Sequence, residues 1–400
     1  MIPEQFEDIR SYIDEEIPAA MEYFINDETS LSLAKLVLPG KTDEEVKALL
    51  RSIKTTDEFQ HIMMTRFVKL IVSTSMKGVV TQGFDKLDKK KAYLFTGNHR
   101  DITLDAFILQ MFMLDNGLET CNIAFGDNLI LNKTIEVFSK SNKMFKVLRS
   151  QNIRELAQNS QHLSDYIRYL IRENKSVWIA QRNGRTKDGN DKTDHGLINM
   201  FSMSGDRKDF VSNLAELNIT PIATSYEYEP CAMMKARESY LKERDGVYVK
   251  KPMEDMDSIV SGLRKKKGTM NIAICRTITY DDLKQFEGAD KHEIVPAVAD
   301  MIDKRIYENY RLYPNNYIAS DWLSGTSTFK KYYTQEEEDV FKAYCDKIFS
   351  KLYEELGSEA EKRFTEILLG IYAIPVQNKM ALTFSSTIDL IAKQSDSGRV

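Results

Sequence analysis

A histidine and two acids stand close together after a short apolar run, within the stretch Leu94–Leu109. The run ends in Thr96-Gly97, and an almost wholly apolar segment follows the second acid, which predicts a strand, a tight turn and a helix. Asp105 would lie in the first turn of that helix, where side chains lean back toward the N-terminus and toward His99. A carboxylate at one imidazole nitrogen fixes the tautomer and leaves the other nitrogen as a base.

The same stretch also fits a purely structural interpretation. Asp101 suits an N-cap position, because its side-chain oxygen can accept from free backbone N–H groups of the first turn. A histidine and a cap in an ordinary strand–helix turn would then explain the pattern. These residues alone do not choose between the two interpretations.

A second polar segment, Gln181–Thr193, follows the apolar run at 177–180. It carries four cations and two glycines: Arg182, Arg185, Lys187, Lys192, Gly184 and Gly189. Arginine suits phosphate oxygens through its planar fork, although such a loop can also be a solvated surface. A further cation, Arg149, ends the apolar run Phe145–Leu148. If these strands belong to one parallel sheet, the cations and His99 share its carboxyl edge.

Composition indicates a soluble, globular chain of 400 residues with a net charge of −5, which argues against general nucleic-acid binding. The four cysteines stand far apart and suit buried thiols in a reducing compartment. The acidic N-terminus lacks the basic and apolar regions of a signal peptide. Because no apolar run approaches the roughly 18 residues of a membrane span, we expect a cytoplasmic protein with at most peripheral membrane contact.

Three regions follow from the periodicity: a helical region at 1–85, a catalytic domain at 86–290 and a helical region at 291–400. Strands separated by helices in the middle region predict an α/β fold with a largely parallel central sheet flanked by helices. A long amphipathic helix is predicted from about Phe59 to Val80. A last strand is predicted at Gly268–Cys275, and a looser polar stretch at Asn315–Thr328.

Several familiar catalytic signatures are absent from the sequence. There is no GxSxG elbow, no GxxxxGK[ST] phosphate loop, no GxGxxG and no set of histidines or cysteines with metal-ligand spacing. These absences disfavour a common serine hydrolase, a P-loop nucleotidase, a dinucleotide enzyme and a zinc site.

The order of the remaining motifs resembles the glycerophospholipid acyltransferases, and their glycerol-3-phosphate and dihydroxyacetone-phosphate branch more than the short lysophosphatidate branch. Four blocks in order carry the resemblance: Asn98-His99-Arg100 with Asp105–Leu109; Gly126–Leu129 with Phe145–Arg149; Gly184–Thr186 with Lys192-Thr193 and Gly196-Leu197; and Ile219–Ile222 with Tyr226-Glu227. The resemblance covers about residues 92–230 and implies a glycerol-3-phosphate acyltransferase-like fold.

Two departures from the family pattern bear on the site. His99 and Asp105 have five residues between them, where the family's HxxxxD motif has four. Either Asp101 or Asp105 could therefore partner the histidine, and we favour Asp105 because an apolar helix follows it. Asn183 stands where the family has glutamate, which puts the identity of the acceptor in doubt more than the class of reaction.

The resemblance implies transfer of a fatty acyl group to the hydroxyl of glycerol-3-phosphate or 1-acylglycerol-3-phosphate in phospholipid biosynthesis. His99 would be the general base and Asp105 its partner. The acceptor-binding set would be Arg100, Arg149, Asn183, Gly184, Arg185 and Lys192. Acyl-CoA or acyl-carrier-protein would be the co-substrate, with no metal, no other cofactor and no nucleic-acid partner. The protein would be peripheral on the inner face of the membrane.

Two alternatives remain open from the sequence. One keeps the acyl transfer but changes the acceptor to a lyso-amino-acid lipid, which needs fewer phosphate ligands and suits Asn183. The other is a non-catalytic membrane- or lipid-binding protein on the same scaffold.

Overall fold

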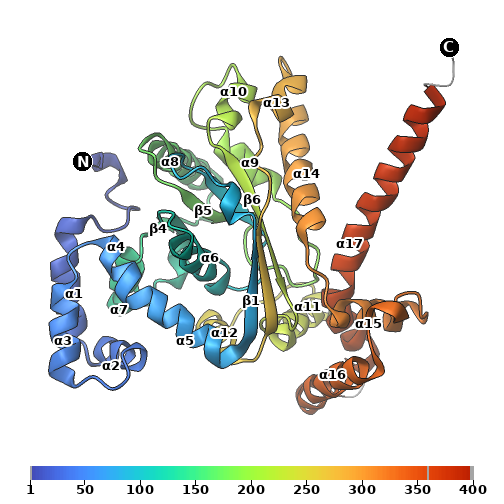
Figure 1. The fold of residues 1–400 in the computed structure, drawn as a ribbon, viewed down its shortest axis with the longest axis horizontal. Helices are drawn as coiled ribbons and strands as arrows, with labels where there is room; N and C mark the ends of the chain where they lie inside the picture. Colours follow the sequence, from blue (N-terminus) through green and yellow to red (C-terminus); the bar gives the residue numbers. More distant parts are fainter. Residues whose placement is uncertain (1, 358–359, 397–400) are drawn as a thin grey trace.

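The structure, a computed structural model, describes residues 2–357 and 360–396, with side chains as far as 382. Within this part of the chain one mixed sheet has the strand order β1-β7-β6-β2-β5-β3-β4 (Figure 1). The strands are β1 (Met76–Gln82), β2 (Leu94–Gly97), β3 (Asn122–Gly126), β4 (Met144–Val147), β5 (Val177–Ala180), β6 (Ile219–Tyr226) and β7 (Gly268–Ile274).

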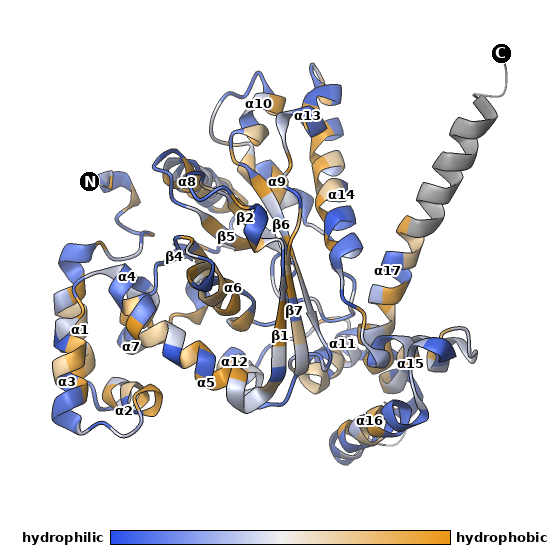
Figure 2. Cartoon of the chain, viewed as in Figure 1, coloured by the Kyte–Doolittle hydropathy of each residue, from blue (hydrophilic) through white to orange (hydrophobic). Residues whose placement is uncertain are grey.

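Five of these strands, from β4 to β6 across the sheet, run parallel, whereas β7 is antiparallel to β6 and β1 is parallel to β7. The predicted α/β class with a largely parallel sheet is confirmed. In β2, Leu94 belongs to one core cluster and its neighbour Phe95 to the other, as expected for a strand buried on both faces. Figure 2 shows hydrophobic residues concentrated on the strands and on α6.

Helices connect the parallel strands and cover both faces of the sheet. They are α6 (Leu104–Asp115), α7 (Lys133–Ser141), α8 (Ile153–Arg172), α9 (His195–Phe201) and α10 (Phe210–Ala215). Because β2 pairs with both β5 and β6, the turn after β2 and the loop after β5 leave the sheet at the same edge.

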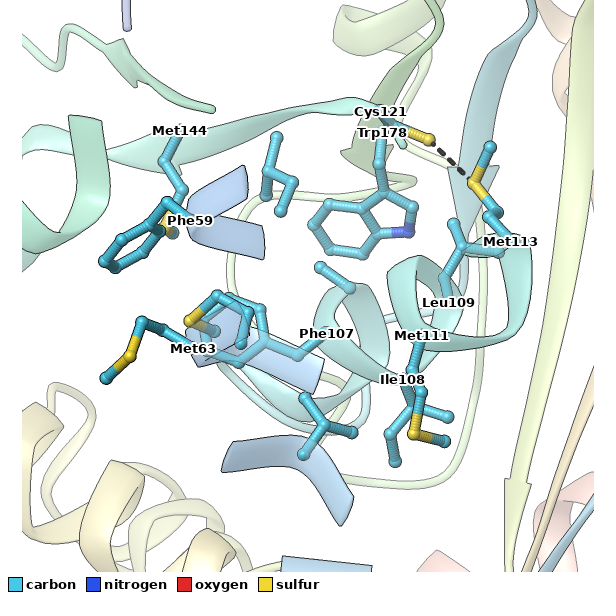
Figure 3. Packing of buried hydrophobic residues seen from close by; sticks show 14 of the residues in the cluster. Phe59, Met63, Phe107, Ile108, Leu109, Met111, Met113, Cys121, Met144 and Trp178 are labelled. Atoms are coloured by element: carbon cyan, nitrogen blue, oxygen red, sulfur yellow. Dashed lines mark hydrogen bonds between the residues drawn. The ribbon is translucent and has the colours of Figure 1, made fainter. Parts of the chain in front are cut away.

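The N-terminal region predicted to be helical at 1–85 is helical only as far as Ser75, and its helices lie on one side of the sheet (Figure 1). Its helices are α1 (Ile17–Asn26), α2 (Glu28–Val37), α3 (Asp43–Ser52), α4 (Thr56–Phe59) and α5 (Thr65–Ser75), with a π-helical turn at Gln60–Met64. Figure 3 shows how this region joins the core: Met63 lies beside Phe107 of α6, and Phe59 beside Met144 of β4.

The helix predicted from Phe59 to Val80 is wrong at its C-terminal end. The helix stops at Ser75, and Met76–Gln82 forms strand β1, which pairs with β7. The β-branched run Val79-Val80-Thr81 suits a half-buried strand at the edge of a sheet, and that pairing overrides the apolar periodicity of the segment.

The helices after β6 surround the sheet and build the C-terminal side of the molecule. They are α11 (Ala232–Asp245), α12 (Glu254–Arg264), α13 (Tyr280–Leu283), α14 (Lys291–Asn309), α15 (Pro314–Ser324), α16 (Gln335–Leu356) and α17 (Glu361–Asp396).

The prediction of a looser polar stretch at Asn315–Thr328 is also wrong, because α15 occupies most of it. Its asparagines are buried and bonded to backbone: Asn315 donates to the carbonyl of Glu227 at 2.5 Å and Asn316 to that of Tyr372 at 2.8 Å.

Candidate active site

His99 lies in the turn between β2 and α6. Its side chain is 13% exposed. The ring meets Trp178 of β5 edge to face, with 6.3 Å between the ring centroids. The backbone of the turn is tied to the loop after β5, because the N–H of Thr186 donates to the carbonyl of His99 at 2.8 Å. Strand pairing and this loop contact together fix where the imidazole stands.

Asp105 is the acid that faces His99. Its Oδ2 accepts from the backbone N–H groups of Arg100 at 2.7 Å and Asp101 at 2.8 Å, and lies 3.4 Å from Nδ1 of His99. Asp101 has another role: its Oδ1 accepts from the N–H groups of Thr103 and Leu104, each at 2.9 Å. Asp101 is not the predicted N-cap, because Thr103 holds that position, but it binds the first backbone N–H of α6, that of Leu104, from three residues upstream. The geometry places Asp105 beside the imidazole.

Tyr226, at the end of β6, completes the surroundings of Asp105. Its hydroxyl donates to Oδ1 of Asp105 at 2.9 Å. Burial, together with the nearby Asp105 and Asp101, raises the pKa of Tyr226 well above its ordinary value, so the phenol keeps its proton and stays a donor. The sequence placed Tyr226 in the fourth block only as a family landmark, and its contact with Asp105 emerges from the fold.

A cleft of about 660 Å³ opens in front of His99, across the carboxyl ends of β3, β4 and β5. Arg149, Asn183 and Gly184, three of the predicted acceptor ligands, line it. Arg182 lines it too, although it was not among the predicted ligands. The cleft therefore brings two arginines and a histidine together in a lining that is otherwise largely apolar, which suits a substrate with an anionic group and a hydroxyl.

Part of the chain matches a known protein family. Residues 78–224, which include His99, Asp105, Arg149 and Arg182, match the family model described as Acyltransferase. The chain carries an acyltransferase domain. The family resemblance inferred from the four sequence blocks is thereby confirmed.

Among solved structures, the crystal structure of PlsC, the 1-acyl-sn-glycerophosphate (LPA) acyltransferase from Thermotoga maritima, matches with a TM-score of 0.39 and 10% identity. The match covers 73% of this chain and 95% of that one. No curated protein matches.

Three predicted ligands of the acyltransferase domain lie outside the lining of the cleft. Arg100 is buried and paired with Asp191 and Glu229. Arg185 is also buried, and its Nη1 has no hydrogen-bond partner among the described residues. Lys192 is exposed at the surface of the loop. None of the three lines the space in front of His99, and their contact with the acceptor stays a prediction.

A second cavity, of about 350 Å³, adjoins the cleft and is almost wholly apolar. It shares Phe125 and Leu129 with the cleft, and Phe107 of α6 and Thr103, just before α6, also line it. Most of its remaining lining comes from α2, the π-helical turn, α7 and α12. The N-terminal helices therefore help to enclose apolar space next to the acyltransferase site.

Within the described residues, no group of three or more histidine, cysteine, aspartate or glutamate side chains is arranged to hold a metal ion. No helix among these residues is both long and apolar enough to cross a membrane.

Proposed function

We propose that the chain transfers a fatty acyl group from acyl-CoA or acyl-carrier-protein to the hydroxyl of glycerol-3-phosphate or 1-acylglycerol-3-phosphate. The observation that carries the proposal is a His99–Asp105 pair in the wall of a cleft that also holds Arg149 and Arg182 and adjoins an apolar cavity. One site then offers a base, phosphate ligands and room for a hydrocarbon chain.

In the proposed reaction, Nε2 of His99 takes the proton from the acceptor hydroxyl as its oxygen attacks the thioester carbonyl. The tetrahedral intermediate expels the thiolate, which receives that proton from the imidazolium. The products are the ester and the free thiol. Asp105 at Nδ1 fixes the tautomer and stabilises the charged imidazolium. The 3.4 Å separation is at the long end for a hydrogen bond, as is common when a site holds no substrate.

The acceptor phosphate would lie between Arg149 and Arg182, since a guanidinium donates to phosphate oxygens in pairs. Holding the phosphate there would align the acceptor hydroxyl with His99, a contribution from proximity. Asn183 and Gly184 of the same loop would contact the acceptor from one side.

Replacing His99 with alanine is expected to lower acyl transfer by about 10²–10⁴-fold, because the reaction loses its positioned base. The measurement is thiol release and labelled lipid from a long-chain acyl-CoA, tested with glycerol-3-phosphate and with lysophosphatidate. His162→Ala is the control, because His162 bonds Asp8 away from the cleft. Full activity of folded His99→Ala would reject the proposed base. Transfer to an acceptor that carries no phosphate would favour the lyso-amino-acid lipid alternative.

Arg149→Ala and Arg182→Ala are each expected to raise the KM for a phosphorylated acceptor by about 10-fold or more, since each removes a charge-assisted hydrogen bond. The KM for the acyl donor should change little. Lys192→Ala serves as the control from the same loop, because Lys192 lies outside the lining of the cleft. Steady-state kinetics with both substrates varied gives the comparison. If Lys192→Ala alone changed the KM for the acceptor, the phosphate would bind at Lys192, as the sequence predicts, and not between Arg149 and Arg182.

The apolar cavity would hold the acyl chain, since it opens beside the cleft where the thioester must react. Ala34 of α2 is buried in its wall, and Ala34→Phe should fill part of it. The expected result is a lower kcat/KM for a palmitoyl than for an octanoyl thioester, since each methylene excluded from apolar burial forfeits about 0.8 kcal/mol. Ala19→Phe, on an exposed position of α1, is the control. An unchanged chain-length profile in Ala34→Phe would place the acyl chain elsewhere.

We also propose a peripheral membrane contact at the mouth of this cavity. Leu33 and Leu36 of α2 line the cavity, yet they are 54% and 59% exposed. Large apolar side chains exposed together at such a mouth suit insertion into the surface of a bilayer. A chain taken up from the membrane would then reach the acyl cavity directly.

Leu33→Ser/Leu36→Ser is expected to reduce sedimentation with phosphatidylglycerol-containing vesicles several-fold. Each substitution removes the free energy gained by burying a leucine side chain in the bilayer, which is at most about 1.5–3 kcal/mol. Val340→Ser on α16, where the side chain is also exposed, should bind like the wild type. Equal sedimentation of the double variant and the wild type would exclude α2 as the contact.

A further inference from the structure

The turn that carries His99 is held by a lysine from outside the matched acyltransferase segment. Nζ of Lys235, on α11, donates to the backbone carbonyl of Arg100 at 2.7 Å. Lys235 is 1% exposed, so water does not compete for this bond. The N–H of Arg100 meanwhile donates to Asp105. Both the carbonyl and the N–H of Arg100, the residue next to His99, are therefore held by buried side chains.

Four buried charges surround this point and balance one another. Arg100 lies 2.6 Å from Oδ2 of Asp191 and 3.2 Å from Oε2 of Glu229, and Lys235 pairs with Oε1 of Glu229. Burial alone would lower the pKa of Arg100, but Asp191 and Glu229 outweigh it and hold that pKa above its ordinary value. Arg100 and Asp191 are therefore charged together, because the pKa of Asp191, which burial alone would raise, is held below its ordinary value chiefly by Arg100. The contacts among the four side chains constrain their geometry mutually.

Residues of the C-terminal helices complete the network. The backbone N–H of Glu229 donates to the hydroxyl of Tyr372 on α17 at 3.0 Å. Tyr310, just after α14, donates through its hydroxyl to Asp191. Thr186, whose N–H already holds the carbonyl of His99, donates its hydroxyl to Asp191 at 2.5 Å. Tyr372 and Tyr310 therefore connect the C-terminal region to Glu229 and Asp191. These two carboxylates in turn contact Lys235 and Thr186, which hold the carbonyls of Arg100 and His99.

We infer that Lys235 and Glu229 are positioning residues for His99, and that they act by fixing the carbonyl of Arg100. The inference rests on the proposed function for its activity readout. Arg100 is accordingly a member of this network of buried charges. If the peptide after His99 can tilt, the N–H groups that hold Asp105 shift with it, and so does the imidazole that Asp105 orients.

The charge balance of the network allows a variant that separates positioning from folding. Lys235→Met/Glu229→Leu removes one cation and one carboxylate and leaves Arg100 paired with Asp191. Replacing a buried ion pair by apolar side chains is often neutral or stabilising, so the fold is expected to persist. The carbonyl of Arg100 nevertheless loses its donor. Glu229→Gln, which keeps the shape of the side chain, is the milder second variant.

The expected result is a kcat about 10- to 100-fold lower in the double variant, with both KM values within about twofold of the wild type, because a small misplacement of the base affects the reaction more than binding. The control is Arg168→Met/Glu216→Leu, which removes an ion pair between buried Arg168 of α8 and partly exposed Glu216 after α10, neither of which lines the cleft. Its kcat should stay at the wild-type level. Circular dichroism and thermal unfolding establish that each variant is folded.

A second readout does not depend on turnover. The rate at which diethyl pyrocarbonate modifies His99, followed by mass spectrometry of the peptide, should change at least about threefold in the double variant and not in the control, because modification depends on ring orientation and access. A folded double variant with wild-type kcat and wild-type modification rate overturns the inference. If the wild type transfers no acyl group to any acceptor, the proposed function fails, and the modification rate alone decides the positioning role.

Discussion

The buried carboxylate of Asp105 is the interaction on which the candidate site depends. It accepts from two backbone N–H groups of the turn, from the hydroxyl of Tyr226 and, at longer range, from His99. A carboxylate so nearly excluded from water is stable only when its oxygens are satisfied, so the shape of the turn, the end of β6 and the first turn of α6 must all be correct together. The imidazole is oriented as a consequence.

The sheet supplies the second constraint, because it brings separate segments to one edge. β2 lies between β5 and β6, and β5 lies beside β3, so the turn with His99, the loop with Arg182 and the strand end with Arg149 face one cleft. Parallel strands place all their carboxyl ends on the same side, which gathers residues that are distant in the sequence without any local signal between them.

The two helical regions serve opposite sides of the site. The N-terminal helices enclose the apolar cavity next to the cleft. The C-terminal helices reach the buried charges behind His99 through Tyr310 and Tyr372. Apolar space is thus enclosed on one side and a buried ionic network lies on the other, and both helical regions lie largely outside the segment that the family model matches.

By itself, the sequence determined the α/β class and most strand positions, because periodicity is a local property of the chain, and it favoured Asp105 over Asp101 as the partner of His99. Only the tertiary structure decided the rest. Strand β1 forms where apolar periodicity predicts helix, because pairing with β7 outweighs local preference. Arg182, and not Lys192, lines the cleft because the direction of a loop side chain depends on the packing of the loop. Lys235 meets Arg100 across 135 positions, a contact that local sequence cannot encode.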